Sequence, residues 1–288
     1  MREVFMNRVE NKVVVITGAA RGQGRSHALR LAEEGADIVA VDLCKDIETA
    51  GYSMASNEEL EETARQVRAT GRRAVVKYAD VRDYAAVRSA IAEGAAELDG
   101  GVDVLIPNAG ILPMGPDVAV DGFAASVDVN LVGVLNTVHA ALPHLRDGAS
   151  VILSGSIASL VPPIGEDEMA GAGYVGYRFS KQVLVQYMKE LTLQLAPRGI
   201  RVNSVHPTTV DTDMTNNDAM LRTYRPDLEN PTKDDVAPIL ATLQAMPITH
   251  VSTSDVSHAV VYLASDESRY VTGTQLRIDG GAIAKHRL

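Results

Sequence analysis

Short runs of β-branched and aliphatic residues alternate along this chain with longer amphipathic stretches. A repeated strand–helix alternation of this kind is typical of β–α–β units in a parallel sheet. The strand-like runs are apolar throughout, as expected where helices cover both faces of a sheet. We therefore predict an α/β fold, a doubly wound parallel sheet of about seven strands with helices on both faces. The predicted strands cover residues 12–18, 37–43, 73–81, 102–110, 150–156, 200–207 and 274–281. No linker or repeat divides the chain, so residues 1–288 form one predicted domain.

Residues 44–56, "CKDIETAGYSMAS", separate the second predicted strand from the helix that follows it. This polar segment, which we call the insertion, is longer than a turn requires. Ser56 and Glu59 have the spacing of a capping box at its far end, and Gly71 stands where the helix should stop. The insertion is either a cover over a ligand bound beside the second strand or a solvated surface loop.

Residues 211–250 form a second long segment, rich in Asn, Asp, Pro and Met. We predict an irregular binding loop at the carboxyl end of the sixth strand and call it the lid. Its apolar residues suit a medium-sized hydrophobic ligand, although packing of the lid onto the core is an equal explanation. These residues are Met214, Met220, Leu221, Tyr224, Ile239, Leu240, Met246 and Pro247.

Composition narrows the choice of partners. The net charge is -10 and no run of five basic residues occurs, which argues against nucleic acid and anionic membranes. The apolar runs are too short to span a bilayer. The single cysteine, Cys44, excludes an internal disulfide and favours a cytoplasmic location. His139 and His144 lie five residues apart and have no partner at metal-ligand spacing, so no metal site is predicted.

A glycine-rich loop follows the first strand, in "TGAARGQGRS". Gly18, Gly22 and Gly24 allow a tight turn and a close approach of the backbone to a pyrophosphate at a helix N-terminus. Arg21 and Gln23 lie between them. The strand before the loop and the helix after it favour a Rossmann-type dinucleotide site over a simple turn.

Asp42 ends the second strand and is followed by Leu43. A carboxylate there accepts hydrogen bonds from the adenosine ribose and repels a 2'-phosphate, which favours NAD over NADP. Arg21 and Lys45 argue the other way, since either cation suits a phosphate. The simpler alternative is that Asp42 only caps a turn.

The ends of the third and fourth strands complete this cleft. Asp80 and Val81 are placed to contact adenine. Asn108, Ala109 and Gly110 are small enough to leave room for the cofactor.

Tyr177 and Lys181 are four residues apart in "YRFSK", so they lie one turn apart on one face of a helix. A nearby ammonium, together with an oxidised nicotinamide, favours a phenolate that can act as a base. Tyr174 is a rival, but Arg178 stands at its fourth position. Arginine cannot reproduce the compact contact that lysine makes with a ribose.

Polar residues elsewhere fit the same chemistry. Ser154 and Ser156 end the fifth strand, where open α/β sheets bind ligands. Asn130 is a polar residue in an apolar helical stretch, where it either bonds to backbone or anchors a proton-relay water.

The chain resembles the short-chain dehydrogenase/reductase family in five motifs, "TGAARGQG", "NAG", "VNLVG", "SGSIAS" and "YRFSK". These motifs occur in the same order as in the family, and the resemblance covers essentially the whole chain. The resemblance implies a catalytic tetrad of Asn130, Ser156, Tyr177 and Lys181. It implies that Tyr177 removes the alcohol proton, Ser156 steadies the oxygen, and Lys181 binds ribose and lowers the tyrosine pKa. Tyr177 and Lys181 therefore also contact the cofactor, and the resemblance adds Pro207, Thr209, Val210 and Thr212 near the nicotinamide.

Three features depart from the family pattern. Pro107 replaces the first Asn of an Asn-Asn-Ala-Gly motif, and "HPTTV" from His206 stands where Pro-Gly is usual. The stretch from Ser156 to Tyr177, with "PPIGEDEMAGAG" at residues 162–173, is longer than usual and is expected to shape the substrate mouth.

Residues 13–44 and the insertion also resemble the carveol dehydrogenase group, which is associated with the redox carrier mycofactocin. This resemblance implies retained NAD beneath the insertion, an external redox carrier, and a hydrophobic, cyclic alcohol or ketone as substrate. The apolar helix after Tyr177 is expected to lie in a subunit interface. The resemblance to the family implies that the assembly is a homotetramer. The alternatives are an NADP-dependent ketone reductase and an NAD-sensing protein without turnover.

Overall fold

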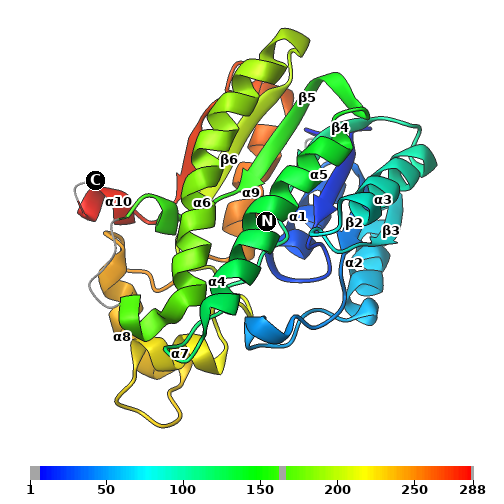
Figure 1. Ribbon diagram of the computed structural model, residues 1–288. Coiled ribbons are helices and arrows are strands. Elements are labelled where there is room, and N and C mark those ends of the chain that lie inside the picture. The colour runs from blue at the N-terminus through cyan, green and yellow to red at the C-terminus, as the bar shows by residue number, and fades with distance from the viewer. Residues whose placement is uncertain (1–6, 162–166, 287–288) are drawn as a thin grey trace.

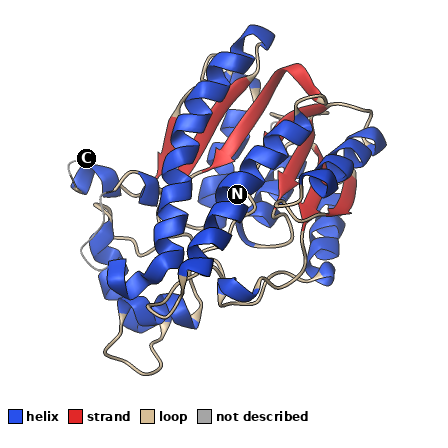
Figure 2. Ribbon diagram, in the orientation of Figure 1, coloured by secondary structure: helices blue, strands red, loops and turns tan. Residues whose placement is uncertain are grey.

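The computed structural model describes residues 7–161 and 167–286. Its strands form one sheet in the order β3-β2-β1-β4-β5-β6-β7, and every pairing is parallel (Figure 2). The strands are β1 (Val13–Thr17), β2 (Asp37–Asp42), β3 (Ala74–Tyr78), β4 (Val102–Ile106), β5 (Leu145–Ser154), β6 (Arg201–Pro207) and β7 (Gln275–Ile278). The predicted fold class is confirmed. The strand order reverses between β1 and β4, and open α/β sheets bind ligands at such a switch point.

Helices cover both faces of the sheet (Figure 1). They are α1 (Gly22–Glu33), α2 (Asn57–Ala69), α3 (Tyr84–Glu97), α4 (Val120–Val127), α5 (Gly133–Ala141), α6 (Asp167–Leu195), α7 (Asp218–Tyr224), α8 (Lys233–Leu243), α9 (Thr253–Ala264) and α10 (Ala282–Lys285). Helices α1, α2 and α9 pack together on one face. Helices α3 to α6 pack on the other, where a π-helical turn, η2 (Asp128–Val132), joins α4 to α5.

The central strands are apolar at every position because both of their faces are buried. In β1, Val13 and Val15 enter the core beneath α3, α5 and α6, whereas Val14 and Ile16 enter the core beneath α1, α2 and α9. Successive strand residues point to opposite faces, so burying both faces requires apolar residues throughout.

The insertion ends as its capping signal predicts. The Ser56 hydroxyl accepts from the Glu59 amide, and the Glu59 carboxylate accepts from the Ser56 amide, so α2 begins at Asn57. Gly71 has a φ of 88°, a left-handed conformation that favours glycine just past a helix end. Within the insertion, a short 3-10 helix, η1 (Glu48–Ala50), precedes Gly51.

The prediction that the lid is irregular was wrong, because it contains α7 and α8. Helix α8 starts with a capping box formed by Thr232 and Asp235. That Thr-x-x-Asp spacing was a readable helix signal, which the surrounding polar and proline residues obscured. The insertion (blue) and the lid (yellow to orange) lie at the same end of the sheet in Figure 1.

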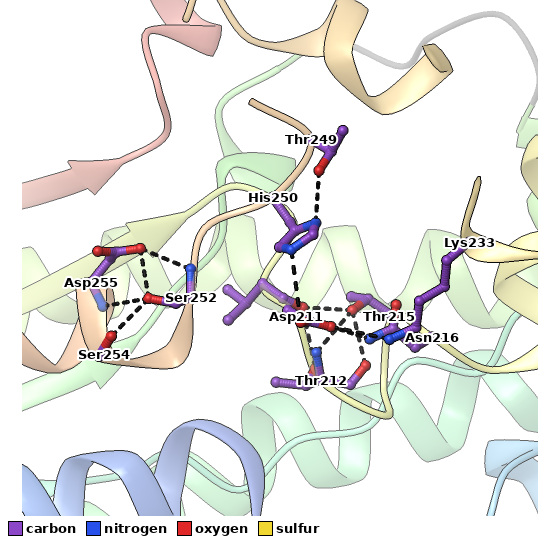
Figure 3. Close-up of polar contacts among 11 residues, drawn as sticks. Asp211, Thr212, Thr215, Asn216, Lys233, Thr249, His250, Ser252, Ser254 and Asp255 are labelled. Atoms are coloured by element: carbon purple, nitrogen blue, oxygen red, sulfur yellow. Dashed lines mark hydrogen bonds and ion pairs between the residues drawn. The ribbon is translucent and has the colours of Figure 1, made fainter. Parts of the chain in front are cut away.

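Asp211 ties the two ends of the lid together (Figure 3). Its carboxylate accepts from Asn216 at 2.6 Å and lies 3.4 Å from the Lys233 ammonium at the start of α8. Its other oxygen lies 3.7 Å from the His250 ring, and its amide donates to the Val251 carbonyl. The contacts of Asp211 therefore hold the first and last residues of the lid next to each other.

Part of the segment expected to shape the substrate mouth, residues 162–166, lies outside the described residues. From Asp167 the chain is helical, with a break at Gly171, whose φ is 78°. A β-carbon at Gly171 would lie 1.9 Å from the Gly115 carbonyl oxygen, so the loop after β4 and the start of α6 require glycine there. Across residues 7–161 and 167–286, no helix is long and apolar enough to cross a membrane.

Candidate active site and cofactor cleft

A cleft lies along the carboxyl ends of β1 to β4, with a volume of about 970 Å³ that includes the open space at its mouth. Residues distant in sequence meet there because parallel strands end at one edge of the sheet. Thirteen of the predicted cofactor-binding residues line it: Gly18, Arg21, Gly22, Gln23, Gly24, Asp42, Leu43, Asp80, Val81, Asn108, Ala109, Gly110 and Thr212.

The glycine-rich loop has the conformation that its spacing suggested. Gly18 and Gly22 have φ values of 67° and 56°. A β-carbon on Gly24 would lie 1.9 Å from the Gly18 carbonyl oxygen, because α1 starts directly against the loop. The loop therefore presents backbone and a helix N-terminus to the cleft, which is the chemistry that a pyrophosphate needs.

Asp42 both shapes a turn and lines the cleft. One carboxylate oxygen accepts from the Ala20 amide at 3.0 Å, and the other accepts from the Cys44 amide at 3.2 Å. Burial raises the pKa of Asp42, while these amides and the charge of Arg21 act to lower it. Each oxygen keeps a free acceptor direction, so turn capping and ribose binding are compatible.

The cations beside Asp42 differ in what they contact. Arg21 donates to the Ser53 carbonyl in the insertion, and its other terminal nitrogen lies 3.1 Å from the Asp213 carboxylate in the lid. Lys45 is exposed at the cleft and makes no ion pair within the described part of the chain. Arg21 therefore links two segments over the cleft, and Lys45 is the cation left to meet a phosphate.

Asp80 is engaged by its neighbour Arg82, whose guanidinium reaches both carboxylate oxygens at 2.6 to 3.0 Å. Burial acts to raise the pKa of Asp80, but the hydrogen bonds and charge of Arg82 outweigh it and the pKa is lowered. The carboxylate stays charged at the cleft wall.

Asn108 connects the cleft to the reactive region. Its amide nitrogen donates to the carbonyls of Thr17 and Gly18, and its oxygen accepts from the Ser154 hydroxyl at 3.3 Å. The Lys181 ammonium donates to the Ser154 carbonyl at 2.6 Å. Lys181 thus lies one strand away from the cofactor cleft, on the buried side of α6.

Tyr177, Lys181 and Ser156 come together where α6 crosses the end of β5. The Lys181 nitrogen lies 5.6 Å from the centre of the Tyr177 ring. Burial lowers the pKa of Lys181 to about 8. The Ser156 hydroxyl accepts from the Ala158 amide and is in hydrogen-bonding contact with the Tyr177 phenol.

The pKa of Tyr177 is raised in the chain by itself, whereas the sequence led us to expect a lowered pKa. Burial raises it, and the hydrogen bond with Ser156 lowers it only in part. Low dielectric disfavours the phenolate when no further positive charge faces it. A base at this position therefore depends on an additional cation beside the ring.

Asn130 lies in the π-helical turn η2 and is fully buried. Its side-chain oxygen accepts from the Ile111 amide at 2.9 Å, and its nitrogen donates to the Ile111 carbonyl at 2.8 Å. The structure therefore favours the backbone-bonding alternative: Asn130 holds the loop after β4.

The rival tyrosine is differently placed. The Arg178 guanidinium lies 5.9 Å from the centre of the Tyr174 ring and donates to the Val161 carbonyl. Arg178 is buried and holds the segment after β5. Ser156 is in hydrogen-bonding contact with Tyr177, whereas Arg178 lies over the Tyr174 ring, so this geometry favours Tyr177.

An apolar group surrounds Tyr177, and we call it the Tyr177 cluster. Its members are Leu112, Met114, Ala170, Tyr174, Tyr177, Met214, Ala219, Met220 and Tyr224. Three of the eight lid residues singled out in the sequence, Met214, Met220 and Tyr224, belong to it. Leu221 is buried elsewhere, and Met246 and Pro247 are exposed. Met214 also lines the cleft, so the cleft and the cluster are continuous.

The remaining predicted contacts near the nicotinamide do not line the cleft. Val210 pairs with Val251 in an isolated bridge, and the Thr209 carbonyl accepts from the Val251 amide. Pro207 ends β6 and is buried. Their contacts with a cofactor stay predictions.

His206, the first residue of the "HPTTV" stretch, is buried and supports the loop after β5 that carries Ser156. One ring nitrogen lies 2.9 Å from the Ser156 carbonyl oxygen, and the other lies 2.8 Å from the Ser204 hydroxyl. Burial lowers its pKa to about 4. A structural role for His206 was expected from the sequence, but its partners Ser156 and Ser204 were not.

The sequence also did not reveal which insertion residues face the cleft. They are Lys45, Ile47, Tyr52, Met54 and Ala55. A tyrosine and apolar residues in an otherwise polar segment were the available signal. Ile111, Val129 and Asp213 line the cleft from other elements.

Comparisons with known proteins agree with this geometry. A family profile described as "Enoyl-(Acyl carrier protein) reductase" matches residues 18–282. The chain is 40% identical to (-)-trans-carveol dehydrogenase of Rhodococcus erythropolis, over 97% of this chain and all of that protein. Carveol dehydrogenase from Mycobacterium avium, solved in complex with NAD, superposes with a TM-score of 0.90 at 42% identity, covering 96% of this chain and 99% of that one.

A short-chain dehydrogenase from Burkholderia cenocepacia, solved in complex with NADP, superposes with a TM-score of 0.79 at 32% identity, covering 96% of this chain and 99% of that one. Each likeness spans nearly the whole chain, and the cleft and the Tyr–Lys pair stand where the motifs predicted. The chain is an enzyme of the oxidoreductase class and belongs to the short-chain dehydrogenase/reductase family.

Proposed function

We propose that this enzyme uses NAD to interconvert a hydrophobic, cyclic, terpenoid-like secondary alcohol and its ketone. The observation that carries the proposal is the continuity of the cofactor cleft with the Tyr177 cluster through Met214. Flexible sulfur-containing and aromatic side chains suit an uncharged ligand of this size. The likeness to two carveol dehydrogenases supports the same substrate class.

The reactive residues have separable roles in this proposal. Tyr177 takes the alcohol proton, and Ser156 donates a hydrogen bond to the substrate oxygen. Lys181 supplies positive charge beside the phenol and keeps donors for a ribose, since only one of its three is used by Ser154. Asn130 positions the loop after β4. When bound, NAD would accept a hydride from the carbon that bears the alcohol.

NAD is preferred over NADP on the basis of Asp42. Its carboxylate stands at the tip of β2, and Arg21 is already paired with Asp213. Lys45 alone favours the alternative, an NADP-dependent ketone reductase. Mass spectrometry of nucleotide released from purified protein distinguishes the two: NAD is expected, and NADP would establish the alternative.

We also propose that the insertion retains NAD, so that an external carrier such as mycofactocin reoxidises the cofactor in place. Five insertion residues line the cleft, the Ser53 carbonyl accepts from Arg21 at the cleft wall, and the Tyr52 hydroxyl accepts from the Leu112 amide beyond the cleft. Replacing residues 45–55 with a short Gly-Ser linker should release NAD during purification. If the variant has a native circular dichroism spectrum and still retains all of its NAD, the insertion is only a surface loop and does not retain the cofactor.

The proposed homotetramer has a candidate surface on α4 and α6. Most of the apolar run after Tyr177 is buried against the sheet, including Leu184, Met188 and Leu191. Phe179 and Leu193 are 45% and 73% exposed, and Phe179 packs on Phe123 of α4 with ring centres 6.0 Å apart. An exposed apolar face on two packed helices suits a second copy of this chain. A cytoplasmic location stays a prediction.

Turnover tests the proposal directly. A cyclic secondary alcohol such as carveol should be oxidised by the purified protein when an artificial electron acceptor is present, and more slowly without it. Absence of turnover under both conditions, with NAD bound, would favour an NAD-sensing protein instead.

A further inference from the structure

Tyr52 reaches from the insertion to the loop after β4. It follows η1, which packs against α4, and its half-buried ring lies against the core beneath α3, α5 and α6. The Tyr52 hydroxyl accepts a hydrogen bond from the Leu112 amide at 3.2 Å. Burial raises the pKa of Tyr52 to about 12, so the hydroxyl is neutral at physiological pH. The insertion is therefore attached well beyond the adenosine end of the cleft.

Leu112 belongs to the Tyr177 cluster, where the alcohol substrate is proposed to bind. Its side chain is buried in the Tyr177 cluster, together with Met114 from the same loop. The residue before it, Ile111, is held on both backbone polar groups by Asn130. Two successive residues of the loop are thus fixed by different elements, one by the π-helical turn and one by the insertion.

The neighbouring residue of the insertion has a second attachment. The Ser53 carbonyl accepts from Arg21, whose guanidinium also pairs with Asp213. Asp213 precedes Met214, a lid member of the Tyr177 cluster. Through residues 52 and 53 the insertion is connected to two of the chain segments that form the Tyr177 cluster, the loop after β4 and the start of the lid.

We propose that Tyr52 is a positioning residue for the substrate pocket. By accepting the Leu112 amide it fixes the apolar wall beside Tyr177, so the segment that lines the cofactor cleft also sets the shape of the alcohol pocket. The proposal rests on the alcohol dehydrogenase function argued above. It differs from a cofactor cover, because a cover alone would not affect which alcohols fit.

Tyr52→Phe is the sharpest test. The ring keeps its packing, but the Leu112 amide loses its acceptor, and a buried amide without a partner drives local rearrangement. A bulky cyclic alcohol fills the apolar wall, whereas 2-propanol reaches little beyond Ser156 and Tyr177. We expect KM for the cyclic alcohol to rise about 5- to 10-fold relative to KM for 2-propanol in the same variant, with the ratio of the two kcat values changed by less than about 2-fold.

Hydrogen–deuterium exchange provides a readout that does not depend on turnover. Deuterium uptake of the peptide that carries Leu112 should increase in Tyr52→Phe. Tyr84→Phe is the matched control, because Tyr84 is exposed on α3, and it should change neither uptake nor KM. Both measurements use the full chain with its bound nucleotide.

Two results would overturn the inference. One is an unchanged ratio of the two KM values together with unchanged exchange at Leu112. The other is loss of bound NAD with an unchanged KM ratio, which would mean that Tyr52 serves only cofactor retention. Inactivity of the wild type towards every alcohol would refute the proposed function, whereas the exchange measurement would still decide whether Tyr52 holds Leu112.

Discussion

The Lys181 nitrogen lies 5.6 Å from the centre of the Tyr177 ring, but its hydrogen bond goes to the Ser154 carbonyl and not to the phenol. The lysine is therefore close enough to act on the phenol through its charge, although its hydrogen bond goes to the backbone. A unit charge at this range, in an environment of reduced dielectric, interacts by a few kcal/mol with the phenolate. Lys181 can therefore assist ionisation of Tyr177 without being its proton acceptor.

Tyr177→Phe tests the assigned base. The variant keeps the ring that packs in the apolar cluster but cannot take a proton. We expect kcat for alcohol oxidation to fall by about 100-fold or more, with nucleotide content unchanged. Tyr174→Phe, which alters the rival tyrosine in the same cluster, should retain most activity. The reverse pattern would move the base to Tyr174.

The pH profile tests the role of Lys181. Burial raises the pKa of Tyr177, so the phenol is protonated near neutral pH unless positive charge faces it. We expect kcat/KM for oxidation to rise with pH as the phenolate forms. In Lys181→Met the phenolate loses a neighbouring cation, so the rise should move to higher pH and activity at pH 7 should fall at least about 10-fold. If kcat/KM in Lys181→Met is lower at every pH but rises over the same pH range as in the wild type, Lys181 only binds cofactor.

Asp42→Asn tests cofactor choice. The substitution keeps one acceptor for the backbone turn but removes the charge that repels a 2'-phosphate. Like charges brought together in a binding site cost several kcal/mol, so the preference for NAD over NADP, as a ratio of kcat/KM values, should fall about 10-fold or more. Lys45→Ala removes the neighbouring cation and should shift the ratio in the opposite direction. Equal ratios in wild type and Asp42→Asn would contradict the assignment.

His27 makes the fold sensitive to acid. It is fully buried between α1 and α9, bonded to the Ser257 hydroxyl, and burial lowers its pKa to about 3. Its unfolded pKa is near 6.5, so the unfolded chain binds a proton that the folded chain excludes between these values. Stability from this group is complete above pH 6.5 and is lost as pH falls towards 3, by up to about 1.4 kcal/mol per pH unit.

His27→Asn, which can keep the contact with Ser257, should therefore flatten the dependence of the unfolding free energy on pH between 6 and 4, measured by urea denaturation. His139→Asn is a matched control, because His139 is exposed on α5. Parallel slopes for wild type and His27→Asn would refute the assignment.

Phe179→Glu tests the proposed interface between copies. Phe179 is partly exposed on α6 and packs on Phe123, so the charge should be tolerated in one subunit but not between two apolar faces. We expect light scattering to show a smaller assembly than the wild type. Tyr84→Glu, a similar change on α3, should leave the mass unchanged. An unaltered assembly in Phe179→Glu would place the contact elsewhere.

Periodicity and motif spacing determined the sheet, its helical layers and the thirteen cleft residues, because those depend on local signals. Unbroken apolar runs meant two buried faces, Ser56 with Glu59 marked the start of α2, and Tyr177 with Lys181 could only share a helical face. The lid helices were missed where Pro and Asn obscured the signal of Thr232.

Contacts between distant segments were decided by the tertiary structure. Nothing local to Arg21 indicated that its side chain would join Ser53 to Asp213 and so be largely engaged before any phosphate arrives. The raised pKa of Tyr177 and the support of Ser156 by His206 arise from burial that only packing creates. The insertion looked like a cover for adenosine in the sequence, but Tyr52 extends it to Leu112, because side-chain reach across a cleft depends on three-dimensional proximity and not on sequence spacing.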